Sequence, residues 1–174
     1  MALQSERGSI LVVRRDRQPD IRPLTISHGA NADRPNRSRF HLEFDWMGTD
    51  DPTAYLCVPT AIQWMDSLLP GGWAEVMATN RALAIAARST LCNALDILPP
   101  CPSEMLVSLA VVPLPNGDCQ KLHDALLKEH QIEVPIIPWG HPMGRQIRIS
   151  AQNYNHPAQY AYLAKSLIEL LSKV

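Results

Sequence analysis

Phe44-Asp45-Trp46-Met47-Gly48-Thr49-Asp50-Asp51-Pro52 is the stretch that decides how this chain is interpreted, because it joins a strand-like segment to a helix start. Asp51 is a favourable N-cap and Pro52 a favourable first helical residue. The amides after Gly48 would then point out of a helix N-terminus, whose partial positive charge attracts phosphate, and the Thr49 hydroxyl would add a donor. An ordinary capped turn explains the same spacing. The local sequence therefore leaves an anion site and a structural turn both open.

Three short segments before this stretch are predicted to be strands. Ile10 to Val13 is a continuous apolar run, typical of a strand buried in a parallel sheet. Arg22 to Ser27 is expected to form a second strand, and His41 to Phe44 alternates polar and apolar residues as a third would. Gly29 to Arg37 is expected to be an exposed loop between them.

Residues 51–98 are predicted to be helical. A first helix begins at Asp51 and ends before Pro70-Gly71-Gly72, and a longer one runs from Trp73 to about Asp96. The longer helix carries one apolar stripe, with Glu75, Arg81 and Arg88 lying off it. The proline cluster from Leu98 to Pro102 cannot continue a helix, so it marks the boundary to a last region, residues 99–174.

The last region alternates strand and helix patterns. Strands are predicted at Met105–Val112, Ile132–Trp139 and Gln146–Ser150, and helices at Cys119–Glu129 and from Pro157 onward. The Gly140–Gly144 segment is spaced like a hairpin connection between two of the strands. The order strand, helix, strand, strand, helix predicts an α+β fold with helices on one face of a small antiparallel sheet.

Composition restricts the class of protein. The chain has 174 residues, a net charge of −1 and 46% hydrophobic residues, as an ordinary globular protein does. No apolar run approaches the roughly 18 residues that span a bilayer, and residues 1–7 lack the apolar segment of a signal peptide. We therefore expect a cytoplasmic protein that does not bind a membrane. The four cysteines lack paired spacing and are expected to be free thiols.

The first 39 residues are locally basic, with eight arginines. Acidic residues interrupt these arginines, and no series of aromatic residues accompanies them, so nucleic-acid binding is not expected. A surface loop or a face that meets a partner segment is the favoured interpretation. The six histidines have no metal-ligand spacing, and no metal site is predicted.

Arg148 is the second candidate for binding chemistry. It lies between Ile147 and Ile149 on a predicted strand and should face away from both. It is either a solvent-facing arginine or a planar cation that binds a carboxylate with two hydrogen bonds. The chain's lysines fall on the polar faces of predicted helices, so no catalytic nucleophile is expected among them.

Several segments in order resemble the class V aminotransferases, most of all the isopenicillin N epimerase-like branch. They are Arg14-Arg15-Asp16-Arg17, the segment from Arg22 to Gly29, and Phe44 to Leu56 with its Gly48-Thr49 pair. The resemblance extends from about Gly8 to the C-terminal helix and includes Arg148-Ile149-Ser150 and Tyr154-Asn155. These enzymes use pyridoxal phosphate and have fold type I.

The resemblance implies a fold and two site roles. The last region would be the small C-terminal domain of a fold type I enzyme, residues 1–50 would be remnant large-domain strands and a loop, and residues 51–98 would link them. Gly48 and Thr49 would contact the pyridoxal phosphate of a neighbouring subunit across a dimer interface. Arg148 would bind the carboxylate of an amino-acid substrate.

The resemblance also implies an incomplete active site. In the family a Schiff-base lysine lies just before the strand that here reads Gly8 to Val13, and residues 1–6 contain no lysine. We therefore expect a truncated chain with no catalytic residue of its own, which self-associates or pairs with a separate lysine-bearing N-terminal half. A stand-alone, non-catalytic binding or structural module is the alternative. Transamination, epimerisation and desulfurisation all remain open.

Overall fold

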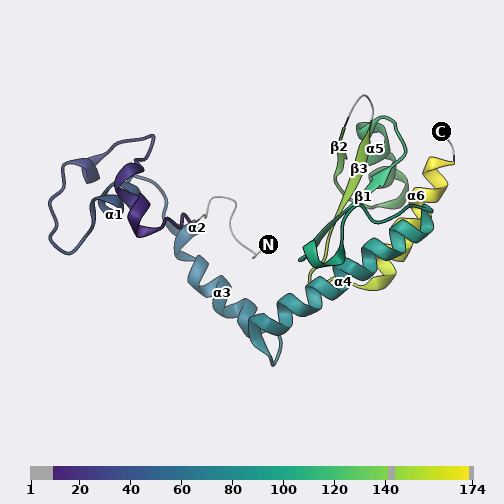
Figure 1. Ribbon diagram of the computed structural model, residues 1–174, viewed down its shortest axis with the longest axis horizontal. Helices are drawn as coiled ribbons and strands as arrows, with labels where there is room; N and C mark the ends of the chain where they lie inside the picture. Colours follow the sequence, from purple (N-terminus) through teal and green to yellow (C-terminus); the bar gives the residue numbers. More distant parts are fainter. Residues whose placement is uncertain (1–9, 141–143, 173–174) are drawn as a thin grey trace. The chain divides into compact units, whose positions relative to one another are not determined.

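The computed structural model describes residues 10–140 and 144–172, and the chain divides into two compact units, Met1–Met65 and Asp66–Val174 (Figure 1). This division differs from the three regions expected from sequence. The long helix belongs to the C-terminal unit because it packs on the sheet of that unit. The centre of the predicted hairpin connection, residues 141–143, lies outside the described residues.

The C-terminal unit is a three-stranded antiparallel sheet with helices packed on it. Its strand order is β1-β3-β2, so β3 is the central strand. The elements are α4 (Gly72–Ala94), η3 (Ser103–Met105), β1 (Leu109–Leu114), α5 (Cys119–His130), β2 (Ile136–Pro138), β3 (Arg145–Ser150) and α6 (Pro157–Leu171). The predicted order of strand, helix, strand, strand, helix is confirmed.

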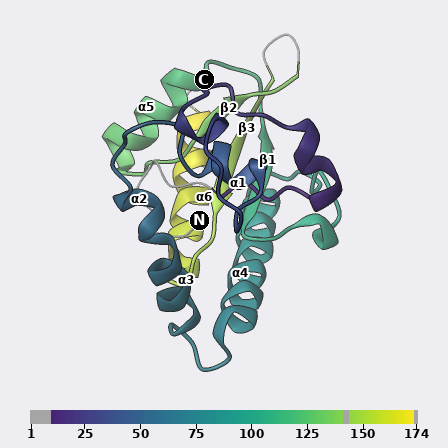
Figure 2. The same cartoon turned by 90° about the vertical axis from the view of Figure 1, so that its left-hand side faces the viewer.

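One apolar cluster joins this sheet to its helices. α4 and α6 lie side by side against the sheet, as Figures 1 and 2 show, and α5 packs on α6 and β2. The fully buried side chains come from every layer and include Leu91, Val112, Leu126, Ile147 and Leu167. Because burial of such side chains is the main favourable term in folding, this unit contains what an independent domain needs.

The helix starts of this unit follow the sequence signals. Asp118 caps α5, because its carboxylate accepts the amide N–H of Lys121 at 2.9 Å. His156 and Gln159 form a reciprocal capping pair around the start of α6, where Pro157 is the first helical residue. Capping fixes these two helix starts at the residues predicted from sequence.

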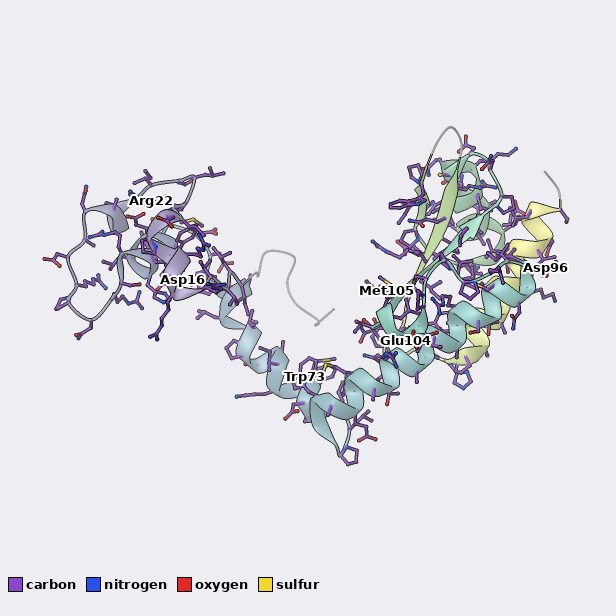
Figure 3. All side chains as sticks on the ribbon, viewed as in Figure 1. Asp16, Arg22, Trp73, Asp96, Glu104 and Met105 are labelled. Carbon is purple, nitrogen blue, oxygen red and sulfur yellow. The ribbon has the colours of Figure 1, made fainter. Side chains whose placement is uncertain are left out.

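α4 is the longest helix, and one of its arginines corrects an expectation. Arg88 was expected to lie off the apolar stripe, but it is buried, with 2% of its surface exposed. Its guanidinium and that of Arg81 reach the segment that contains Glu104 and Met105, labelled in Figure 3. Hydrogen bonds to the Cys101 carbonyl and the Ser103 hydroxyl offset part of the cost of burying the Arg88 charge. No described helix has the length and apolar character needed to cross a bilayer.

The N-terminal unit contains short helical elements. They are η1 (Arg15–Asp20), η2 (His28–Ala30), α1 (Arg39–Phe44), α2 (Thr53–Leu56) and α3 (Val58–Asp66), whose last residue falls in the other unit. The strands predicted at residues 10–13 and 22–27 are wrong, since neither segment is a strand. A strand needs a hydrogen-bonded neighbour, and the described residues of this unit provide none. Ile10, Val12, Leu24 and Ile26 are exposed instead.

The third predicted strand is also wrong, because residues 41–44 lie in α1. Ser38 caps this helix by accepting the amide N–H of His41 at 3.3 Å. Phe40 and Phe44 then stack one turn apart, with ring centroids separated by 4.5 Å. An alternation over four residues fits a strand and a helix equally well, so the cap decides the outcome.

Arginine contacts hold α1 to the preceding segments. Arg22, labelled in Figure 3, pairs with the carboxylate of Glu43, which is only 4% exposed. Arg39 donates to the carbonyl oxygens of Gly29 at 2.7 Å and Ala30 at 2.9 Å. A Cβ at Gly29 would lie 1.7 Å from the Leu42 carbonyl oxygen, so only glycine permits η2 to approach α1 this closely.

Candidate functional site

The turn at Gly48-Thr49 precedes a helix that begins one residue later than expected. Pro52 is the N-cap of α2, and Thr53 is its first residue. Asp51 nevertheless satisfies the helix start, because its carboxylate accepts the Thr53 amide N–H at 3.0 Å and also the Thr53 hydroxyl. These bonds from the Thr53 hydroxyl and amide lower the pKa of Asp51. The predicted positions, Asp51 as N-cap and Pro52 as first helical residue, are therefore wrong by one residue, although Asp51 still accepts hydrogen bonds from the helix start.

The amide donors of this turn are already partly used. The Asp51 amide donates to the Asp50 carboxylate at 2.8 Å, so two neighbouring carboxylates occupy the amides of residues 51 and 53. α2 has only four residues, too few for a sizeable helix dipole. The amides of Asp51 and Thr53 are therefore not free to bind an anion, whereas Gly48 and Thr49 remain candidates. Within residues 10–140 and 144–172 the Thr49 hydroxyl has no hydrogen-bond partner.

Gly48 adopts a backbone conformation that favours glycine. Its φ is +140°, and a Cβ built there would meet no atom within 4 Å. The position is therefore restricted by backbone geometry and not by crowding. An open backbone at Gly48 lets another group approach the turn closely.

Arg148 lies at the centre of the sheet and faces solvent. On β3 it is exposed, while Ile147 and Ile149 on either side are buried, as the alternation predicts. Its Cα partner on β1 is Val111, and its own amide donates to the Pro135 carbonyl at 3.1 Å. In the part of the chain that the structure describes, its guanidinium has no hydrogen bond or ion pair.

None of the strand residues that share the solvent-facing side of the sheet with Arg148 is acidic. Register places six side chains on this face with it: Leu109, Val111 and Pro113 from β1, Ile137 from β2, and Gln146 and Ser150 from β3. An arginine flanked by apolar and neutral residues attracts anions, and its planar fork suits a carboxylate.

The backbone that follows Arg148 is held by several contacts. The buried Tyr160 on α6 donates its hydroxyl to the Ser150 carbonyl at 2.6 Å, and burial raises the pKa of this phenol. The Ala151 amide donates to the Ser108 carbonyl at 2.8 Å. Asn80 on α4 donates to the Gln152 side chain at 3.0 Å. These bonds fix the end of β3 and hence the direction in which Arg148 points.

Arg145 is a buried arginine that the sequence interpretation missed. Only 5% exposed, it donates from Nε to the Pro115 carbonyl at 2.7 Å and from Nη1 to the Asp118 carbonyl at 2.6 Å. Gly117 leaves the space for this side chain. Because residues 145, 147 and 149 share one face, the period of two could have identified it as a structural residue.

The two predicted sites belong to different units of the chain. Gly48 and Thr49 lie in Met1–Met65, and Arg148 lies in Asp66–Val174. Among the described residues, no group of three histidine, cysteine, aspartate or glutamate side chains is placed to hold a metal ion. The candidate chemistry therefore consists of anion recognition at two separate places.

Comparison with known proteins shows similarity to L-cysteine desulfhydrases, although no family model matches. An Arabidopsis thaliana protein named "Probable L-cysteine desulfhydrase, chloroplastic" is 30% identical over 139 residues, which cover 72% of this chain and 29% of that protein. The L-cysteine desulfhydrase of the same plant is 25% identical over 178 residues, covering 91% of this chain and 38% of the relative. The chain thus spans about a third of the length of these relatives.

A solved structure supports the fold. The 8-amino-7-oxononanoate synthase of Francisella tularensis matches with a TM-score of 0.50 and 17% identity, over 77% of this chain and 37% of the synthase. At this identity the match concerns the fold alone. The predicted fold class, a small antiparallel sheet with helices as in the C-terminal domain of a fold type I enzyme, is confirmed.

Proposed function

We propose that this chain is the C-terminal part of a pyridoxal-phosphate enzyme of the class V aminotransferase type that acts on amino acids. The observation that carries this proposal is Arg148, an exposed arginine that has no partner among the described residues and shares its sheet face with no acidic strand residue. Similarity to L-cysteine desulfhydrases over most of the chain supports it.

Each described candidate residue suits one part of the cofactor–substrate pair. Arg148 would bind the substrate carboxylate, and the Thr49 hydroxyl and the open backbone at Gly48 would contact the cofactor phosphate. Bound pyridoxal phosphate would supply the electron-withdrawing ring that stabilises negative charge on the substrate. This chain's part would be to hold the substrate by its carboxylate and to place a donor beside the phosphate.

A catalytic lysine would have to come from elsewhere. The described lysines, Lys121, Lys128 and Lys165, are exposed on α5 and α6. A lysine on an exposed helix face lacks the desolvated surroundings that activate a lysine nucleophile. We therefore propose that a lysine-bearing N-terminal segment completes the site, and that L-cysteine, named in both relatives, is the first substrate to test.

The experiment is a sulfide-release assay on L-cysteine with the assembled protein, this chain plus the lysine-bearing segment. Arg148→Gln is expected to raise KM at least about tenfold, because a charged hydrogen-bond pair is worth about 1.5–3 kcal/mol. Arg17→Gln removes another exposed arginine, from η1, and serves as the control. Equal KM values for the two variants would exclude Arg148 from substrate binding.

The phosphate contact has its own test. With the chain alone, thermal melts across a phosphate titration should show stabilisation that Thr49→Ala weakens without changing the melting temperature in the absence of phosphate. Asp51→Ala should lower that melting temperature, since loss of a capping carboxylate costs about 1 kcal/mol. Phosphate-independent melts for wild type and both variants would remove this role for the isolated chain.

A second candidate function is a stand-alone binding or structural module. The complete apolar cluster of the C-terminal unit favours it, because such a unit can fold without a catalytic partner. The two functions differ in assembly. A chain that purifies as a stable monomer and releases no sulfide with any lysine-bearing segment supports the module, whereas an active complex supports the enzyme.

A further inference from the structure

The buried guanidinium of Arg88 on α4 has no acidic partner among the residues that the structure describes. Arg88 is 2% exposed and takes part in none of the ion pairs of the described chain. Its Nη1 donates to the Cys101 carbonyl and its Nη2 to the Ser103 hydroxyl, both at 2.8 Å. A buried charge held only by neutral acceptors is costly, so this site favours any anion that forms beside it.

Cys101 lies where such an anion would form. Its Sγ accepts a hydrogen bond from Arg88 Nη1 at 3.5 Å, and the residue is half-buried. Arg88 Nε is buried and has no hydrogen-bond partner in the described part of the chain. The Nε–H points to the edge of the guanidinium opposite Nη1, so Nη1 is the donor that contacts the sulfur.

The other three cysteines lack this combination. Cys57 is exposed, but no described cation bonds its sulfur. Cys92 is buried, and burial raises the pKa of its thiol, although the charge of Arg88 opposes this shift. Cys119 is half-buried like Cys101, but its neighbour in sequence is the negatively charged Asp118, which caps α5. Exposure alone would make Cys57 the first to react, whereas a cationic donor favours Cys101.

We propose that Cys101 is a site of oxidation by hydroperoxides, with Arg88 as the group that stabilises the oxidised sulfur. The Cys101 thiolate attacks one peroxide oxygen, an S–O bond forms and the O–O bond breaks. The sulfur loses two electrons, and the departing hydroxide or alkoxide takes up a proton to leave as water or alcohol. A second equivalent of peroxide converts the sulfenic acid to a sulfinate.

The oxidised sulfur of Cys101 would lie beside the N–H donors of the Arg88 guanidinium. A sulfenate or sulfinate oxygen would accept from Nη1 of Arg88 and supply the missing negative charge. Arg81 binds the same segment through the carbonyls of Ser103 and Leu106, just before β1. Oxidation would therefore strengthen the attachment of this segment to α4.

A competition within one molecule tests the proposal. The purified chain is treated with limiting hydrogen peroxide and dimedone, and the adduct at each cysteine is quantified by peptide mass spectrometry. Labelling at Cys101 is expected to exceed that at Cys57 and Cys119 by at least about threefold, since a cationic neighbour activates a thiol. Faster labelling of Cys57 or Cys119, or a Cys92–Cys101 disulfide in place of the adduct, would overturn the proposal.

A second measurement uses carboxylate as a stable substitute for the sulfinate. Cys101→Asp is compared with Cys101→Asn, which has the same shape without the charge. The Asp variant is expected to melt at the higher temperature with Arg88 present, and the order should reverse in an Arg88→Met background. If Asn is the more stable residue in both backgrounds, Arg88 does not stabilise an anion at position 101.

Discussion

Different kinds of contact stabilise each of the two units internally. Asp66–Val174 has a contiguous apolar cluster from a sheet and three helices. Met1–Met65 depends on arginines that bond carbonyl and carboxylate groups, such as Arg22 with Glu43. Large apolar side chains of this unit, including Leu24 and Val12, remain exposed. The C-terminal unit therefore has a core of its own, whereas the N-terminal unit leaves much of its apolar surface exposed.

The largest test of this comparison is to separate the units. A fragment of residues 66–174 is expected to unfold cooperatively on heating and to give dispersed amide signals, because it retains the whole apolar cluster. A fragment of residues 1–65 should show neither property, and it should self-associate. Cooperative unfolding of the shorter fragment as a monomer would show that arginine contacts suffice.

Single truncations sharpen the same comparison. Ile147→Ala removes a fully buried side chain from β3 and should lower the free energy of unfolding by about 2–5 kcal/mol in urea titrations. Leu24→Ala, at a fully exposed position, should change it by less than about 0.5 kcal/mol while improving solubility. A comparable loss from Leu24→Ala would mean that residue 24 is buried in solution.

Removing an ion-pair partner should cost more stability in the N-terminal unit than in the C-terminal unit. Arg22→Ala leaves the buried Glu43 carboxylate with only Arg39, at 4.0 Å, and should cost about 1–3 kcal/mol, seen as faster amide exchange in α1. Lys128→Ala removes an exposed partner of Asp124 on α5 and should cost less than about 1 kcal/mol. Equal exchange in α1 before and after the Arg22 change would count against this distinction.

The smallest expected effect concerns acid. Hydrogen bonds from Lys128, Gln120 and His123 lower the pKa of Asp124 from 3.8 to about 2. Because the folded pKa is the lower one, the contribution of Asp124 to stability is present above pH 3.8 and is lost as pH falls to about 2. Asp124→Asn should flatten the decline in melting temperature over this range. The same decline in melting temperature for wild type and Asp124→Asn would show that the Asp124 interactions contribute nothing to stability.

The C-terminal unit was largely predictable because its elements are long and marked by signals. The apolar period of 3.6 residues that begins at Tyr160 and the start at Pro157 specify α6, although Ile168, expected on the buried face, is exposed. The alternation around Arg148 gives the correct face of β3. Buried arginines were harder. A hydrophobicity pattern assigns Arg88 and Arg145 to the surface because both are charged. Their long side chains nevertheless reach carbonyl groups inside the unit.

The N-terminal unit was mispredicted because its signals are short. Residues 10–13 have strand composition, but a strand forms only where a neighbour offers hydrogen bonds. In α1 the Ser38 cap outweighed a four-residue alternation. For the candidate site, residue spacing could identify Arg148 and Thr49 as donors, but it could not show that Asp50 and Asp51 already occupy the neighbouring amides.

Prolines on both outer strands have a consequence for aggregation. Pro113 lies in β1 and Pro138 ends β2, which has only three residues, so each outer strand of the described sheet contains a residue without an amide hydrogen. A strand from another molecule could not continue the hydrogen-bond ladder past these positions. The sheet is therefore a poor template for fibre growth. Copies of this chain that associate should do so through side chains, forming discrete complexes that dissociate in mild detergent.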